Sequence, residues 1–224
     1  MMFKPQIILS ILMLSVAAET PVFAKPNPQI QVVDTEFSKG RLGHEQTISL
    51  QDAVKLHGHF CDGLVIGFLG LRQVLYSLYP NRIIDRTDLR IVSKPAPCLS
   101  DVALFLTGAR YQYNTFYVSA DIKYIYIVQR ISTQKVYGVK LKPGTVPESI
   151  KTMGNQAIKG ELDGCGLDKL KKLEDDLSAK LLAGKPEEFF ILDEIQNFKW
   201  LPVFRSDFPK TDIFNKGREK CLKK

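Results

Sequence analysis

The stretch from Cys61 to Tyr79 constrains the fold of this chain more than any other segment. Its apolar residues recur at the spacing of a buried α-helix. They are Leu64, Val65, Phe68, Leu71, Leu75 and Leu78. Gly63, Gly67 and Gly70 lie on one side of this helix, at i, i+4 and i+7. Since glycine lets another backbone or a ligand approach closely, we expect tight helix packing at the second and third of them.

Helices and strands are segregated around this central helix, which favours an α+β fold. Ser49-Leu50-Gln51-Asp52 resembles a capping box with Asp in place of Glu, and predicts a short helix that ends near Gly58. The other expected elements are a strand at Leu89–Val92, a helix at Asp101–Leu106 capped by Gly108, an antiparallel meander of strands at 114–120, 123–131 and 135–141, and helices from Pro147 to about Lys159 and from Leu167 to Ala183. We therefore predict a single α+β domain over residues 45–200, with helices packed on an antiparallel or mixed sheet.

Residues 1–24 have the features of a signal peptide. The apolar run Ile7–Ala18 is followed by the small-residue site Val22-Phe23-Ala24. A membrane-spanning helix needs about 20 apolar residues, and this run is shorter. We therefore predict a periplasmic or secreted protein with no membrane span, in which residues 25–44 are a polar lead-in to the domain. An uncleaved interfacial anchor is the alternative.

Positive charge is concentrated in a basic tail at residues 201–224. The chain has a formal net charge of +7, and residues 210–224 hold six Lys and Arg against two acids, or +4. The rest of the chain is close to balanced. A basic end without a nucleic-acid-reading motif more often means a solvated tail or attraction to an acidic surface, so we predict no nucleic-acid partner.

Two of the three histidines stand just before Cys61, in the sequence His57-Gly58-His59-Phe60-Cys61-Asp62-Gly63. Imidazole and thiolate are ligands that zinc prefers. On an unbroken helix His59 would point away from the other two, but the two glycines indicate an interruption. In a loop or extended turn the three alternate side chains converge, so we predict a metal site at a junction between two helices. If the junction is helical, His57 and Cys61 bind the metal, and His59 either supports a ligand without binding the metal or faces the substrate.

Cys98 is the expected fourth ligand, because the stiff Pro95-Ala96-Pro97 segment before it would hold it in place. Asp101 follows three residues later, on the same helical face. Asp101 or Asp62 could orient a ligand imidazole or act on a bound water, and these are the candidate catalytic residues. Four protein ligands would make a structural site, and three with one open position a catalytic site.

Disulfide bonds are the main alternative to a metal site, because the chain has four cysteines and exported proteins commonly bridge them. A Cys61–Cys98 disulfide is the strongest competitor. Cys165 and Cys221 have no nearby histidine, so they are the better candidates for a structural bridge. His44 is isolated in a polar stretch and is interpreted as a surface residue.

Two segments resemble a known family. His57-Gly58-His59-Phe60-Cys61-Asp62-Gly63-Leu64, followed by Gly67, is similar to the His-Gly-His-x-Cys-Pro-Gly-Leu signature of the FmdE family, which is named after formylmethanofuran dehydrogenase. Cys98 to Ala103 with Leu106-Thr107-Gly108 resembles its downstream Cys, Asp-Ala and Thr-Gly motifs. The likeness covers about residues 45–145. It implies an α+β domain in which the signature residues bind a metal, with zinc the expected ion, next to a pocket and often in a homodimer.

The chain departs from the family pattern at a few positions. Asp62 stands where the family usually has Pro, and Ala109-Arg110 replace a Cys-Thr pair. The resemblance therefore implies no ligand or reactive thiol at position 109. It supports metal-site roles for the matching residues, which are His57, His59, Cys61 and Cys98, with Asp101 close by.

Three functions are compatible with these features. The first is an exported zinc protein whose site, near Tyr111, Tyr113 and Tyr117, accepts a small-molecule ligand or substrate and could act through a metal-bound water. The second is a metal-delivery or partner-binding protein without turnover that docks through its basic tail. The third is a disulfide-stabilised binding module without metal. The sequence does not decide whether the protein is an enzyme, and it indicates no substrate.

Overall fold

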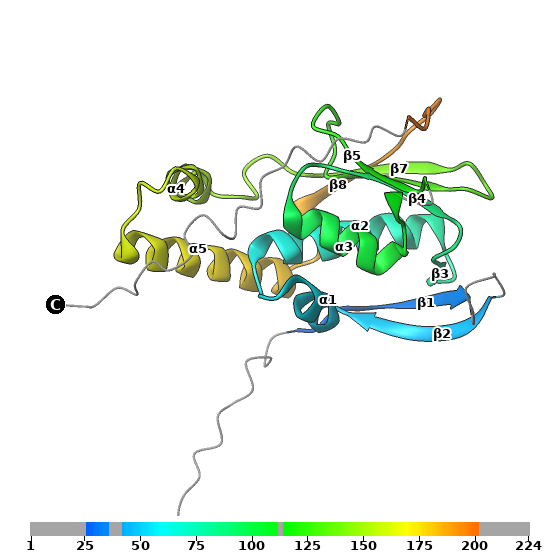
Figure 1. Ribbon diagram of the computed structural model, residues 1–224, viewed down its shortest axis with the longest axis horizontal. Helices are drawn as coiled ribbons and strands as arrows, with labels where there is room; N and C mark the ends of the chain where they lie inside the picture. The colour runs from blue at the N-terminus through cyan, green and yellow to red at the C-terminus, as the bar shows by residue number, and fades with distance from the viewer. Residues whose placement is uncertain (1–25, 36–41, 112–113, 202–224) are drawn as a thin grey trace, which may run out of the picture.

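The computed structural model describes residues 26–35, 42–111 and 114–201 (Figure 1). Within these ranges the chain forms eight strands and six helices. In chain order they are β1 (Gln29–Thr35), β2 (Leu42–Ser49), α1 (Leu50–His57), α2 (Asp62–Leu78), β3 (Ile83–Asp85), β4 (Leu89–Ser93), α3 (Pro97–Thr107), β5 (Phe116–Val118), β6 (Tyr126–Arg130), β7 (Val136–Leu141), α4 (Glu148–Ile158), α5 (Gly164–Ala183), α6 (Pro186–Phe189) and β8 (Phe190–Glu194). The predicted α+β class is confirmed.

A five-stranded sheet has the order β5-β4-β6-β7-β8. β5 runs parallel to β4, and the other neighbours are antiparallel. The predicted meander is therefore correct for β6 and β7 but wrong for its first strand, because β5 pairs with β4. A parallel pair needs a long crossover connection, and α3 provides it.

A second sheet of three strands has the order β2-β1-β3. None of these strands is predicted from the sequence, where β1 falls in the polar lead-in. β1 is a half-buried strand, since Ile30 and Val32 are each 1% exposed while Gln29 and Gln31 face solvent. β8, which forms one edge of the larger sheet, is also absent from the prediction. In Figure 1 α2 and α3 lie between the two sheets.

The helix α2 is the centre of the hydrophobic core. Leu64, Val65 and Phe68 are completely buried, and the helix packs against α3, α5, β6 and β7. Its glycines lie where other side chains approach closely. A Cβ added at Gly67 would stand 2.7 Å from the Tyr126 hydroxyl, and one at Gly70 would stand 3.1 Å from the Phe190 ring. The tight packing expected at these two glycines is confirmed.

Substitution of Gly67 by alanine is expected to lower the free energy of unfolding by about 1–3 kcal/mol, because the added methyl group overpacks the core. Gly154→Ala in α4 is the matched control. No atom lies within 4 Å of a Cβ added there, so this variant should gain about 0.5–1 kcal/mol from better helix propensity. Urea unfolding measures both. Equal effects of the two substitutions would contradict the close approach at Gly67.

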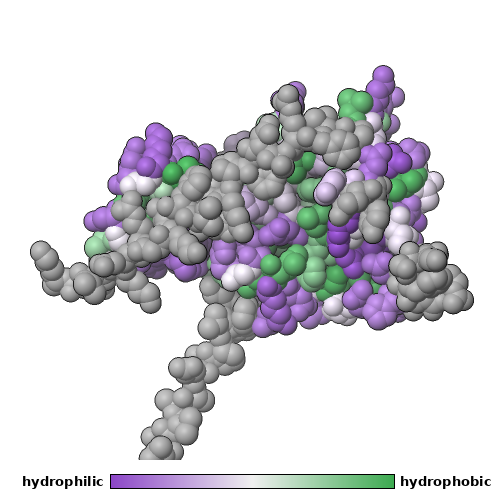
Figure 2. Space-filling view, viewed as in Figure 1, coloured by the Kyte–Doolittle hydropathy of each residue, from purple (hydrophilic) through white to green (hydrophobic). Residues whose placement is uncertain are grey.

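The surface of the protein carries both hydrophilic and hydrophobic side chains. Figure 2 shows hydrophilic residues over much of the visible face, including the region of α4, and a group of hydrophobic residues near its centre. None of the helices in the described ranges has the length and apolar character that crossing a membrane requires. The proposed signal peptide lies outside the described residues.

Candidate metal centre

The junction between α1 and α2 holds the three residues that we call the His/Cys cluster, His57, His59 and Cys61. α1 ends at His57 because Gly58 adopts a left-handed conformation, with φ of 96°, and donates its amide to the Val54 carbonyl at 2.8 Å. α2 begins after Cys61, whose extended backbone makes it the N-cap. The expected interruption between the two helices is confirmed.

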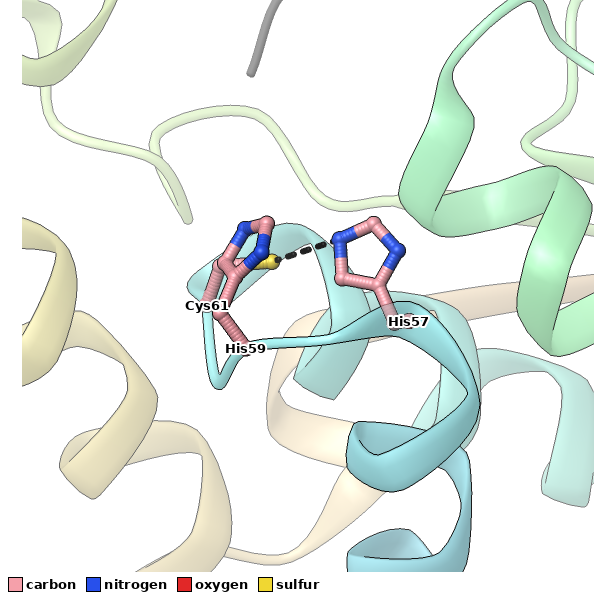
Figure 3. A group of neighbouring side chains, drawn as sticks. All are labelled: His57, His59 and Cys61. Atoms are coloured by element: carbon pink, nitrogen blue, oxygen red, sulfur yellow. Dashed lines mark hydrogen bonds between the residues drawn. The ribbon is translucent and has the colours of Figure 1, made fainter. Parts of the chain in front are cut away.

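The side chains of the His/Cys cluster point toward one another (Figure 3). Their potential ligand atoms all lie within 4.8 Å of one another. His57 Nε2 is 3.8 Å from Cys61 Sγ, and the centroids of the two imidazole rings are 4.4 Å apart. As whole residues, backbone included, His57 and Cys61 have intermediate exposure, whereas His59 is exposed. The fold thus brings together a group that could hold a metal ion.

Cys98 approaches the His/Cys cluster from the start of α3, where Pro97 is the first helical residue. Its Sγ lies 3.4 Å from the Sγ of Cys61. Gly63 permits this approach, since a Cβ there would stand 3.0 Å from the Cys98 sulfur. Both thiols are free, and the separation is much longer than the roughly 2.05 Å of a disulfide bond. The two sulfurs are therefore neighbours without being bonded.

Asp101 contacts His57 from the next turn of α3. Its Oδ2 lies 2.7 Å from His57 Nδ1, and the His57 side chain is only 2% exposed. The hydrogen bond with Asp101, and after it the contact with Cys61, raises the pKa of His57 to about 9. Because Nδ1 faces the carboxylate, Nε2 is the nitrogen that faces Cys61. Carboxylates orient ligand imidazoles in this way in metal sites.

Tyr126 supports the start of α3, and no sequence pattern identifies it as part of the site. Its side chain is completely buried, and its hydroxyl donates a hydrogen bond to the Leu99 carbonyl at 2.8 Å. Leu99 lies between Cys98 and Asp101 in the first turns of α3. A tyrosine within the apolar pattern of β6 carries no sequence signal for this contact, because the contact depends on the tertiary fold.

A cavity of about 320 Å³ lies beside the His/Cys cluster. One part of its wall consists of the cluster, Asp62, Pro97 and Cys98. The other part comes from α4 and α5, which contribute Gly154, Ala157, Ile158, Leu170 and Glu174. Nothing in the sequence connects these two helices with the site. They complete the wall of the cavity.

Two carboxyl groups line this cavity, those of Asp62 and Glu174. Asp62 accepts a hydrogen bond from the Gly63 amide at 2.7 Å, and burial raises its pKa. Burial, and after it the charge of Asp62, raises the pKa of Glu174 to about 7. Glu174 is not predicted from the sequence, since an acidic residue on an amphipathic helix ordinarily belongs to the solvated face. Asp101, the other candidate catalytic residue, contacts His57 and is not part of the cavity wall.

Two of the three tyrosines expected near the site lie elsewhere. Tyr117 packs edge-on against Trp200, with ring centroids 4.7 Å apart, and Tyr111 is 59% exposed. Neither belongs to the cavity wall, so this expectation is wrong for both. Tyr113 lies outside the described residues.

Two expectations concern residues away from the cavity. His44 is exposed on β2, as expected. Cys165 is disulfide-bonded, whereas its expected partner, Cys221, lies outside the described residues. Cys61 and Cys98 are thus free thiols, whereas Cys165 is oxidised in a disulfide bond.

Comparison with protein families gives a match that spans this site. The family model described as "FmdE, Molybdenum formylmethanofuran dehydrogenase operon" matches residues 56–191. The matched region starts just before the His/Cys cluster and ends within β8, so it includes Cys98 and the helices that complete the cavity wall. A search of curated proteins finds no significant match. Because the family model covers more than half of the chain, this protein belongs to the FmdE family.

Proposed function

We propose that this chain is an exported FmdE-family protein that binds one zinc ion through the His/Cys cluster and Cys98, beside a pocket for a small molecule. The convergence of four donor side chains from two distant segments carries the proposal. The ligand atoms of the cluster lie within 4.8 Å of one another, and the sulfur of Cys98 is 3.4 Å from that of Cys61. Export is supported by the signal-peptide features of residues 1–24.

The donor set fits zinc. Mixed imidazole and thiolate ligands suit this metal, whereas magnesium and calcium prefer oxygen ligands. Two sulfurs bound to one tetrahedral zinc at about 2.3 Å are roughly 3.8 Å apart. The observed separation of 3.4 Å between Cys61 Sγ and Cys98 Sγ is close to this value. A small shift of α3 relative to α2 would be sufficient to accommodate the ion.

The residues around the donors hold them in place. Asp101 fixes the ring of His57 through the 2.7 Å hydrogen bond, and Tyr126 fixes the first turn of α3 through Leu99. Cys61 accepts a hydrogen bond from the Leu64 amide at 3.4 Å. The metal-free thiol of Cys61 has a raised pKa, so the thiolate would form as zinc binds, and the positive end of the α2 dipole would then help to stabilise it.

The cavity supports a role for the site in binding and reaction. If the exposed donor His59 gave up its position, or if the shell expanded to five ligands, a bound zinc ion would supply Lewis acidity, which lowers the pKa of water and polarises carbonyl groups. His59 is the exposed donor and lines the cavity, so a small molecule reaches the donors from this side. Asp62 presents a carboxyl group to the same space and can hold a proton there.

Metal analysis of the purified protein tests the proposal. We expect about one equivalent of zinc in the parent protein and less than about one-tenth in His57→Ala, since loss of a ligand sharply weakens the site. His44→Ala is the matched control, because His44 is exposed on β2; it should retain the zinc of the parent. A parent protein without stoichiometric metal would contradict the proposal.

A further inference from the structure

Glu174 lines the cavity from α5, a different element from those that hold the metal donors. One side of the cavity wall thus has the His/Cys cluster, from the junction between α1 and α2, and Cys98 from α3. The other side has the carboxyl group of Glu174 from α5. Ala157, Ile158 and Leu170 give the wall around Glu174 an apolar character. These apolar neighbours partly exclude water from the carboxyl group. A ligand in the cavity would lie in the same surroundings.

The carboxyl group of Glu174 has no partner among the described residues. Lys171, whose charge acts on Glu174, instead binds Asp175, with Nζ 2.8 Å from Oδ2, and Lys172 binds Asp176. Ser178 donates its hydroxyl to the backbone carbonyl of Glu174 and not to the side chain. A half-buried carboxyl group that the fold does not use for packing or pairing is a candidate for a functional role.

Burial and neighbouring charges raise the pKa of Glu174. Burial has the largest effect, and the neighbouring acids Asp62 and Asp175 add to it, whereas Lys171 opposes it. Together they raise the pKa of Glu174 to about 7. The remaining titratable groups of the cavity are those of the His/Cys cluster and Cys98, and the residues that α4 contributes do not titrate. A group that titrates near the working pH is suited to proton transfer.

We propose that Glu174 is the proton-transfer residue of this pocket, and that its carboxylate takes the proton of a hydroxyl or water group bound between it and the metal donors. In this step the O–H bond of the ligand breaks, its electron pair stays on the ligand oxygen, and the proton bonds to an Oε of Glu174. The neutral carboxylic acid then returns the proton to the leaving or product group. This role rests on the proposed zinc site.

The same features define the class of ligand. None of the described residues that line the cavity is a lysine or an arginine, while Asp62 and Glu174 are both acidic. An anion that arrives already charged therefore finds no cation in the wall except the metal. A small neutral molecule with a weakly acidic O–H group suits the pocket better, because it becomes anionic only after it has transferred its proton.

Acetohydroxamic acid is a suitable probe, because it is neutral and must lose a proton to bind a metal as an anion. Calorimetry on the zinc-loaded full chain, in buffers of different ionisation enthalpy, gives both affinity and proton release. We expect the parent to release close to no proton to the buffer, since Glu174 accepts it. Glu174→Gln should release about one proton and bind about 10-fold to 100-fold more weakly, because a charge-assisted hydrogen bond is lost.

The controls separate proton transfer from a structural role. Asp176→Asn removes the same charge from an exposed position of α5 and should behave like the parent. Azide has no proton to give, so its affinity for Glu174→Gln should equal or exceed that for the parent. Glu174→Asp keeps a carboxyl group and should release as little proton as the parent. This variant also tests the proposal if Glu174→Gln proves unstable.

The proposed role of Glu174 is overturned if Glu174→Gln matches the parent in hydroxamate affinity and proton release, or if the zinc-loaded parent does not bind the hydroxamate. It is also overturned if azide binding falls in parallel with hydroxamate binding, since that outcome indicates damage to the metal site. A parent that fails to bind zinc would contradict the proposed function itself, and metal analysis identifies that case before any probe is added.

Discussion

Replacement of Cys98 by serine is expected to weaken zinc binding by roughly 100-fold to 1,000-fold. Structural zinc sites bind with about 10–16 kcal/mol, which is about 2.5–4 kcal/mol for each of four ligands. Cys98 is the one donor that comes from α3, and its sulfur lies 3.4 Å from that of Cys61. Serine has nearly the same size as cysteine but cannot supply a thiolate. The substitution should therefore lower zinc affinity and leave the packing of α3 intact. Competition with a chromogenic chelator measures the affinity.

Ser100→Ala is the matched control for this substitution. Ser100 lies two residues further along α3, and its buried hydroxyl has no hydrogen-bond partner among the described residues. Removal of that hydroxyl should therefore cost little stability and leave zinc affinity unchanged. Equal losses in both variants, or an unchanged affinity in Cys98→Ser, would show that Cys98 is not a ligand.

Asp101→Asn is expected to lower zinc affinity by about 10-fold to 100-fold, the usual effect of removing a carboxylate that orients a ligand histidine. The carboxylate accepts a hydrogen bond from His57 Nδ1 at 2.7 Å and so directs Nε2 toward Cys61. Asparagine can accept the same hydrogen bond but carries no charge. The expected result is a weaker site with its ligands unchanged.

The protons released on zinc binding distinguish this role of Asp101 from a general loss of stability. In the metal-free protein the pKa of His57 is about 9, raised first by Asp101, and that of Cys61 is about 12, raised first by the hydrogen bond with Cys98. Both groups are therefore protonated at about pH 7.5, and zinc displaces a proton from each. Without the carboxylate the pKa of His57 falls toward about 6.5, so Asp101→Asn should release about one proton fewer.

Calorimetry in several buffers measures this proton count. Asp176→Asn, at an exposed position of α5, should release as many protons as the parent. An unchanged count in Asp101→Asn would mean that the carboxylate does not control the protonation of His57, and the orienting role would be wrong.

Local sequence patterns are sufficient to predict most helices of this protein and the interruption that forms the His/Cys cluster. The capping box of Ser49 and Asp52 is present in the structure, and Gly58 ends α1 in the left-handed conformation that the pattern requires. These signals act over a few residues, so they do not depend on the rest of the fold. The alternation that brings His57, His59 and Cys61 together has the same local origin.

The pairing of strands is harder to predict from the sequence. β5 looks like the first strand of a meander, yet it pairs in parallel with β4 because α3 carries the chain across the sheet. β1 is short of apolar residues, and only Ile30 and Val32 mark its buried face. Pairing partners and buried faces of this kind are set by tertiary packing and not by local propensity.

The cavity is the part of the site that the sequence does not predict. Its second wall comes from α4 and α5, and nothing in their amphipathic patterns distinguishes Glu174 from the solvated acids around it. Tyr126 is similar, since a tyrosine in an apolar strand gives no indication that its hydroxyl meets the carbonyl of Leu99. Both roles follow from contacts between elements that are far apart in the chain.

X-ray absorption at the zinc edge of the metal-loaded protein tests the proposed coordination most directly. Ligation by His57, His59, Cys61 and Cys98 predicts two sulfur neighbours at about 2.3 Å and two nitrogen neighbours at about 2.0 Å. A shell of nitrogen and oxygen without sulfur would contradict the account, because the two thiols that meet at 3.4 Å would then have no part in holding the metal.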